Sequence, residues 1–138
     1  MSWFILAWQR AADFSGRSRR KEYWYFQLFN SLIFFALAIL SASFDWLFFG
    51  EGSKGGVLLF VIILYGIISF VPSLAITIRR LHDVGKSGWW YCIGFVPIVG
   101  SIILLVLTIL DSEPFANQWG LDPRVAERAA APPYPMYR

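Results

Sequence analysis

The sequence of 138 residues is poor in charge, in cysteine and in histidine, and each shortage excludes a class of function. Only 15% of the residues are charged and 57% are hydrophobic, whereas soluble domains carry about 25% charged and about 45–50% apolar residues. A chain of this size has too little interior to bury such an excess of apolar residues in water. Cys92 is the single cysteine, which excludes an internal disulfide. His82 is the single histidine, and one imidazole cannot build a zinc site that needs several imidazole or thiolate ligands.

The sequence also lacks the motifs of nucleotide, nucleic-acid and catalytic sites. Gly85-Lys86-Ser87 resembles the end of a phosphate-binding loop, but Arg80 stands where that motif needs its first glycine. No serine or cysteine has a base and an orienting acid at a recognisable spacing. The net charge of +3 is accompanied by no nucleic-acid-binding motif. We therefore expect no catalytic residues, no metal, no cofactor and no nucleic-acid partner.

Three long apolar runs predict an all-α integral membrane protein with three transmembrane helices. The runs cover 23–44, 57–78 and 89–110. None contains a charged residue, and 22 residues reach roughly 33 Å as a helix, enough to cross a hydrocarbon core of about 30 Å. Gly94, Pro97 and Gly100 loosen the first half of the third run, so a broken or re-entrant form of that run is the alternative.

A short amphipathic helix is predicted over 2–12, before the first span. Phe4, Ala7 and Trp8 recur there at helical spacing. The helix is too short to cross a bilayer, so it either lies at the membrane interface or packs on the protein's own spans. The predicted parts of the chain are an interfacial helix with a basic segment (1–22), a three-span domain (23–110) and a polar, proline-rich tail that we expect to be disordered at its end (111–138).

Basic residues gather at two places beside the apolar runs, and we expect these two places to meet. Five lie before the first span and three lie in the second loop, whereas the first loop holds Lys54 alone. With three spans, the N-terminus and the second loop share one side, which the positive-inside rule places in the cytoplasm, and the tail falls outside. The combined cluster consists of Arg17, Arg19, Arg20, Glu22, Arg79, Arg80, His82, Asp83 and Lys86.

Three interpretations fit this cluster. Glu22 and Asp83 would each accept a two-pronged hydrogen bond from an arginine, which makes the cluster structural. Leftover positive charge would bind anionic lipid headgroups, at about 1 kcal/mol per basic residue near the surface, or a membrane partner. An enzyme acting on lipid headgroups would use His82 as its base and the arginines as phosphate clamps.

A transporter or channel component is a further alternative. Gln27 and Asn30 lie on one side of the first span, and Ser69, Ser73 and Thr77 follow one face of the second. Such polar stripes hold helices together more often than they line a path. Three spans are few for a pore, so this alternative requires a homo-oligomer.

Several blocks of the chain occur in an order that is typical of one family. FSGRSRRKEYW opens the set at 14–24, and PSLA, RRLHDVGKSGWW and PIVG follow at 72–75, 79–90 and 97–100, before DSEP at 111–114. Together they resemble the DUF805 family of small bacterial inner-membrane proteins, and the block at 79–90 is the most specific. The resemblance implies a bacterial inner-membrane protein and brings no established activity, substrate or catalytic residues.

Overall fold

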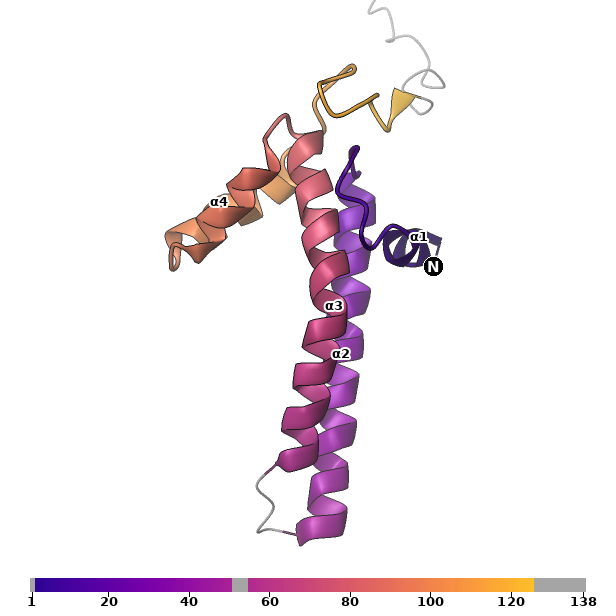
Figure 1. The fold of residues 1–138 in the computed structure, drawn as a ribbon, viewed down its shortest axis with the longest axis vertical. Helices are drawn as coiled ribbons and strands as arrows, with labels where there is room; N and C mark the ends of the chain where they lie inside the picture. Colours follow the sequence, from indigo (N-terminus) through magenta and orange to yellow (C-terminus); the bar gives the residue numbers. More distant parts are fainter. Residues whose placement is uncertain (1, 51–54, 126–138) are drawn as a thin grey trace, which may run out of the picture.

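The computed structural model describes residues 2–50 and 55–125. The regular elements of this part of the chain are all helices, joined by turns and irregular segments, with an isolated bridge between Asn117 and Gly120. The predicted all-α class is therefore confirmed for the described residues. Two long antiparallel helices, α2 and α3, form a hairpin, and the shorter elements gather at one end of it (Figure 1). In chain order the elements are α1 (Ser2–Gln9), α2 (Arg20–Phe49), α3 (Gly56–Asp83), the 3-10 helix η2 (Gly88–Phe95) and α4 (Val99–Ile109).

Helices α2 and α3 contain the first two predicted spans and extend beyond both. They have 30 and 28 residues, or roughly 45 and 42 Å at 1.5 Å per residue. Their outward side chains are apolar and exposed, as at Phe35, Ile39 and Ile67, which are 62%, 66% and 67% exposed. Apolar surface of this extent on a monomer marks contact with a membrane or a partner. The hairpin therefore has the length and the surface of a membrane-crossing pair.

Asp45 joins the two long helices at the end of the hairpin where the chain turns. Its side chain accepts hydrogen bonds from the backbone N–H groups of Val57 and Leu58, at 3.3 and 3.0 Å. The first N–H groups of a helix have no partner within the helix, so this buried carboxylate caps α3 from the neighbouring helix. The first predicted span stops at residue 44, just before Asp45, whereas α2 continues to Phe49.

The N-terminal helix α1 packs against the start of α2, which is one of the two positions the sequence allowed. Ala7 is fully buried and joins Phe26 and Ile76 in a small core against which Phe4 and Trp8 are packed. The rings of Phe4 and Phe26 stack with their centroids 5.8 Å apart. The helix thus covers the junction of α2 and α3 with its apolar face.

The predicted single helix over 89–110 is wrong, and the broken form that the sequence also allowed is the one observed. The chain reverses between η2 and α4, where Ile98 adopts a φ of 63°. A Cβ atom on Gly100 would lie 1.8 Å from the carbonyl oxygen of Ile93, so only glycine permits this close return. At about 2.0 Å per residue for η2 and about 1.5 Å for α4, each arm reaches roughly 16 Å, half of a bilayer core.

This reversal brings the start of the tail back to the basic end of the hairpin. The N–H of Glu113 donates to the carbonyl of Asp83 at 2.8 Å, and the Asn117 side chain donates to the carbonyl of His82 at 2.9 Å. The expectation that the tail lies on the opposite side is therefore wrong for residues 111–125, because two short arms replace one crossing. Residues 126–138, including the proline-rich end expected to be disordered, lie outside the described residues.

Candidate functional site

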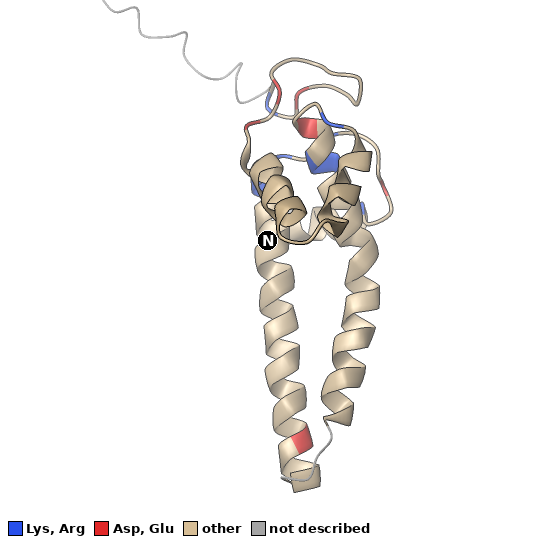
Figure 2. Ribbon diagram, turned by 90° about the vertical axis from the view of Figure 1, so that its left-hand side faces the viewer, with Lys and Arg blue, Asp and Glu red and all other residues tan. Residues whose placement is uncertain are grey.

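Most charged residues of the described chain gather at the end of the hairpin where α2 begins and α3 ends (Figure 2). The predicted cluster lies there, so the expectation that its two basic segments meet is confirmed by contacts between them. Arg17, from the first segment, donates to Asp83, from the second, at 3.1 Å. The structure nevertheless divides the nine residues into a buried network and an exposed surface.

The buried network is organised by the last turn of α3. Successive residues of an α-helix point about 100° apart, so the run Arg79-Arg80-Leu81-His82-Asp83 reaches in several directions at once. Arg79, Arg80 and Asp83 are each 0% exposed. Each of these side chains holds a different segment of the chain against α3.

Arg79 holds the segment that follows α1. Its Nη1 donates to the carbonyl oxygens of Arg10 and Asp13, at 2.7 and 2.5 Å. The side chain of Asp13 shapes this turn by accepting bonds from Ser15, and these bonds together with Arg10 lower the pKa of Asp13 to about 2. The backbone of Arg79 also accepts from the N–H of Ser18 at 3.1 Å.

Arg80 holds the end of α4. It donates to the carbonyl oxygens of Thr108, at 3.1 Å from Nε, and of Leu110. The last carbonyls of a helix lack partners within the helix and carry its negative dipole end, so a cation is stabilising there. Arg80 also donates to Asp83 three residues later, the pair that helical spacing predicts.

Asp83 is the acceptor at which the network converges. Its Oδ1 accepts from Arg17 Nε, while Oδ2 accepts from Arg80 and, at 2.5 Å, from the hydroxyl of Ser112. Arg17 continues to the closing segment and donates to the carbonyls of Phe115 and Glu113 at 2.7 and 2.5 Å. Two buried arginines therefore share one carboxylate, and the predicted two-pronged bond from a single arginine is not formed.

Glu22 was expected to accept a fork from an arginine, and this prediction is wrong. Glu22 is 4% exposed, and the oxygen Oε1 lies 3.9 Å from Arg79 Nη2 without a hydrogen bond. Arg79 instead donates from Nη1 to the carbonyls of Arg10 and Asp13, in the segment after α1. Of the two acids predicted to pair with arginine, Asp83 thus accepts arginine hydrogen bonds and, within the described residues, Glu22 does not.

His82 joins three segments through its ring and its backbone. Its Nδ1 lies 3.2 Å from the carbonyl oxygen of Gly16, a turn residue with a φ of 77°. The ring stacks on Trp119 with centroids 4.7 Å apart and planes inclined by 7°. Helix α3 ends at Asp83, and just beyond it Gly85 has a φ of 73° and the Lys86 N–H donates to the Leu81 carbonyl, as in a glycine-terminated helix.

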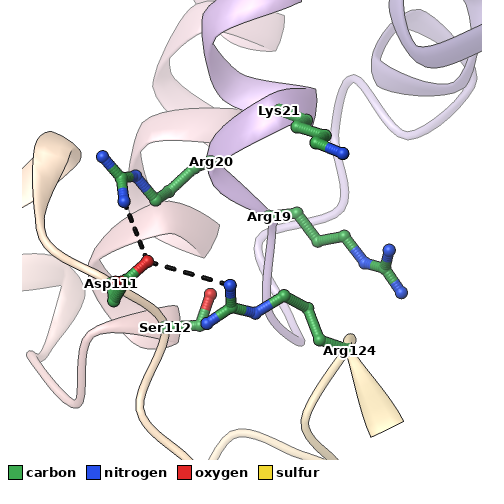
Figure 3. A pocket seen from close by; sticks show the side chains of 6 residues that line it. All are labelled: Arg19, Arg20, Lys21, Asp111, Ser112 and Arg124. Atoms are coloured by element: carbon green, nitrogen blue, oxygen red, sulfur yellow. Dashed lines mark hydrogen bonds and ion pairs between the residues drawn. The ribbon is translucent and has the colours of Figure 1, made fainter. Parts of the chain in front are cut away.

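The exposed surface is a pocket of about 280 Å³ beside the start of α2, shown in Figure 3. Arg20 donates to Asp111 at 2.8 Å, and Arg124 lies 3.8 Å from the same carboxylate. The bond from Arg20 and its charge hold the pKa of Asp111 below its ordinary value, and Arg124 adds to this effect. Arg19 and Lys21 extend away from Asp111 (Figure 3). We call this set the basic pocket; its lining is Arg19, Arg20, Lys21, Asp111, Ser112 and Arg124.

Lys86 belongs to neither group. Its ammonium lies 5.6 Å from the centroid of the Trp90 ring, and the side chain is exposed at the start of η2. The remaining members of the predicted cluster divide as follows. Buried are Arg17, Glu22, Arg79, Arg80, His82 and Asp83, whereas Arg19 and Arg20 line the basic pocket.

Sequence reasoning missed the contribution of the closing segment. Ser112 and Asn117 hold the end of α3, and Asp111 and Arg124 complete the basic pocket. The available signal was the block DSEP, whose polar residues directly follow an apolar run. Its importance was hidden because a continuous third span would have carried it to the opposite side.

The polar residues within the spans bond either between α2 and α3 or within their own helix. Asn30 accepts from the hydroxyl of Tyr65 at 2.7 Å, which links α2 to α3 as predicted for a polar residue inside a span. Gln27 instead donates to Tyr23 within α2, at 3.3 Å. Thr77 donates to the carbonyl of Ser73 in its own helix, at 2.7 Å. Gln27 and Thr77 therefore bond within their own helices, whereas Asn30 bonds between α2 and α3.

A hairpin of two apolar helices with a buried ion-pair network at one end defines a small helical integral membrane protein. The chain belongs to the DUF805 family, described as proteins of unknown function, and the match covers residues 11–121. It is 34% identical over 125 residues to inner membrane protein YhaH of Escherichia coli (strain K12), covering 91% of this chain and 98% of that protein. It is 35% identical over 124 residues to inner membrane protein YhaI of the same strain, covering 90% and 97%.

No solved structure matches the chain. The family match and the two relatives confirm the resemblance seen in the sequence, and together with α2 and α3 they identify a bacterial inner-membrane protein.

Proposed function

We propose that this protein binds anionic phospholipids, with the headgroup in the basic pocket and an acyl chain along the start of α2. The observation that carries the proposal is the continuity of two surfaces. Arg20 and Lys21 line the basic pocket and also line an apolar groove of about 270 Å³ with Trp24, Tyr25 and Leu28. A phospholipid presents the same sequence of charge followed by apolar chain.

The charge of the basic pocket favours an anionic headgroup. Four cations and one acid line it, which gives a formal charge of 4 − 1 = +3. Basic residues near a membrane surface attract anionic lipid at about 1 kcal/mol each. Arg20 already donates to an acidic oxygen of Asp111, so its guanidinium is positioned for a phosphate oxygen.

The groove below the pocket suits the first part of an acyl chain. Trp24 and Tyr25 are 40% and 48% exposed, and Leu28 is 53% exposed one turn further along α2. Tryptophan and tyrosine are enriched at the boundary between headgroups and hydrocarbon. The pocket therefore stands at headgroup depth, and the groove leads from it into the apolar zone.

The topology that supports this proposal has α2 and α3 crossing the inner membrane and η2 with α4 entering it without crossing. The basic end then lies in the cytoplasm by the positive-inside rule. It carries nine of the twelve basic residues: the five before the first predicted span, the three in the second loop, and Arg124. α1 lies at that surface with Ile5 exposed and Ala7 buried against the hairpin.

The buried arginines take a structural role in this proposal. Arg17, Arg79 and Arg80 donate to carbonyls of distant segments, and all three side chains are buried away from solvent. A headgroup enzyme would need His82 beside a phosphate clamp, whereas His82 does not line the basic pocket. Lipid binding at the exposed cations is the function that the geometry favours.

Native mass spectrometry of the full chain in detergent, with equal amounts of phosphatidylglycerol and phosphatidylcholine, tests the proposal. We expect the wild-type protein to retain phosphatidylglycerol preferentially. Replacing Arg20 and Lys21 together by glutamine removes two cations, about 2 kcal/mol, and should weaken retention about 30-fold. The same spectra report the oligomeric state. The alternative function, a transporter or channel component, requires a homo-oligomer.

Two control variants accompany this test. The first keeps the charge of the basic pocket, and the second removes a cation that lies outside it. Exchanging the two residues, Arg20→Lys with Lys21→Arg, should preserve the preference for the anionic lipid. Lys86→Gln removes a cation that lies outside the pocket and should leave retention unchanged. Equal retention by the double glutamine variant and the wild type would contradict the proposal.

A further inference from the structure

We infer that a second lipid site lies between α3 and η2, and that it takes a long apolar chain ending in an uncharged hydroxyl group, which donates to Nε2 of His82. The site is a cavity of about 540 Å³. It shares no lining residue with the basic pocket, so the inference is independent of the function proposed above.

The cavity follows one face of α3. Phe70, Leu74, Ile78 and His82 line it at intervals of four residues, which places them on one side of the helix. Twelve residues at about 1.5 Å each give this wall a length of roughly 18 Å. The other wall comes from η2 and includes Trp89, Tyr91, Cys92 and Phe95. This elongated apolar shape fits a chain better than a compact ligand.

His82 supplies a hydrogen-bond acceptor at one end of the cavity. Its Nδ1 faces the carbonyl of Gly16 at 3.2 Å, and a carbonyl only accepts, so Nδ1 carries the proton. In the neutral ring Nε2 is then the acceptor. A Cβ atom on Gly88 would lie 3.5 Å from Nε2, and Gly88 lines the cavity, so this nitrogen is directed toward it. The stack on Trp119 fixes the plane of the ring.

The chemistry of the walls selects an uncharged head. No described residue that lines the cavity is charged, in contrast to the basic pocket. An ionised head would lose its hydration there without gaining a counter-charge, which is costly. A hydroxyl group donates to Nε2 and leaves no charge unpaired. Diacylglycerol and long-chain isoprenoid alcohols share this chemistry.

The direction of the cavity also agrees with a membrane lipid. His82 lies in the last turn of α3, at the polar end of the hairpin, and Phe70 lies near the middle of the same helix. A lipid in the same leaflet has its head at the surface and its chain inside, so head and chain meet the matching ends of the cavity.

Photolabelling of the full chain in phosphatidylcholine nanodiscs tests this inference. The probe is a diacylglycerol with a diazirine in one acyl chain, compared with the same lipid after acetylation of its hydroxyl. We expect the free hydroxyl to raise labelling of peptides from 70–78 and 89–95 about fivefold, the factor that one hydrogen bond typically gives. Equal labelling by the two lipids in the wild-type protein would overturn the inference. So would stronger labelling by the corresponding phosphatidic acid.

Two variants make the test specific. His82→Phe keeps an aromatic ring for Trp119 and removes both nitrogens, so the two lipids should label it equally. Leu74→Trp fills part of the cavity, leaves His82 unchanged, and should reduce labelling by both lipids. If His82→Phe lowers thermal stability, this variant tests whether the lipid chain occupies the cavity. Tyr65→Phe removes a polar group from α3 outside the cavity and should leave the fivefold difference intact. A diazirine-bearing isoprenoid alcohol, run in parallel, distinguishes the two lipid sources.

Discussion

Asp83 and Asp111 accept hydrogen bonds from arginines at the same end of the molecule, but in opposite surroundings. Asp83 is fully buried and is shared by Arg17 and Arg80. Asp111 is 69% exposed, and its partner Arg20 is 40% exposed. The first carboxylate has no access to water, whereas the second is surrounded by it.

This difference separates charge that holds the fold from charge that remains available to a ligand. A buried ion pair leaves an uncompensated charge when one partner is removed, so each partner becomes indispensable. An exposed pair is solvated and contributes little to stability. Its partners can therefore exchange one acid for another, such as a lipid phosphate, without loss of the fold.

The largest expected effect is at Asp83. Asp83→Asn keeps the shape of the side chain and removes the charge that faces two buried arginines. We expect the free energy of unfolding to fall by about 3–5 kcal/mol, the usual consequence of breaking a buried pair. Thermal unfolding in detergent, followed by circular dichroism, measures this loss.

Asp111→Asn is the matched control for that measurement, because it makes the same chemical change at the same end of the molecule. It should leave the unfolding temperature close to that of the wild type. If the two variants unfold at similar temperatures, the division into a buried network and an exposed surface is incorrect.

The sequence allowed local parts of this network to be predicted. The spacing of Arg80 and Asp83 predicts an ion pair on one helix turn, and Gly85 predicts the end of that helix. The bond from Arg17 to Asp83 crosses 66 residues, and the bond from Ser112 crosses 29. Such contacts depend on the path of the chain, which local spacing does not encode.

The path was mispredicted at one place, the third apolar run. Its length and composition match those of a transmembrane helix, and hydropathy does not distinguish one crossing from two short arms. The deciding feature is the approach of Gly100 to the Ile93 carbonyl, together with the positive φ of Ile98. A continuous third span would place Asp111 and Arg124 on the opposite side of the membrane from Arg19 and Arg20. The predicted cluster therefore included Arg19 and Arg20 but not Asp111 and Arg124, which also line the basic pocket.

A smaller effect on stability is expected at the far end of the hairpin. Asp45→Ala removes the cap from the first N–H groups of α3, at Val57 and Leu58, and should cost about 1 kcal/mol in the free energy of unfolding. Ser43→Ala is the control, since the exposed Ser43 hydroxyl donates to the carbonyl of Ile39 in its own helix. If Asp45→Ala lowered the free energy of unfolding as much as Asp83→Asn, the buried ion pairs at the basic end would not be more important for stability than this helix cap.

Asp111 should have a larger role in lipid binding than in stability. Its carboxylate occupies Arg20 and lies near Arg124, so it competes with an anionic headgroup for the same donors. Asp111→Asn raises the formal charge of the basic pocket by one, and we expect retention of phosphatidylglycerol to rise about fivefold. Native mass spectrometry at matched lipid concentrations measures the change, and a fall in retention would indicate that Asp111 supports the headgroup instead.

The smallest expected effect concerns Asp13, which is intermediate between the two regions. The bonds from Ser15 and Arg10 lower the pKa of Asp13 to about 2 from 3.8, and its carbonyl accepts from Arg79. A carboxyl with a lowered pKa contributes stability above its unfolded value of about 3.8, and this contribution is lost as the pH falls toward about 2. Asp13→Asn removes the titrating group, so the wild type should unfold at a higher temperature than this variant at pH 5, and the gap should close by pH 2. The other carboxyl groups titrate in both proteins and cancel in this difference. A gap that stays constant across this range would mean that the ionised carboxylate does not hold the turn from which Arg79 is bound.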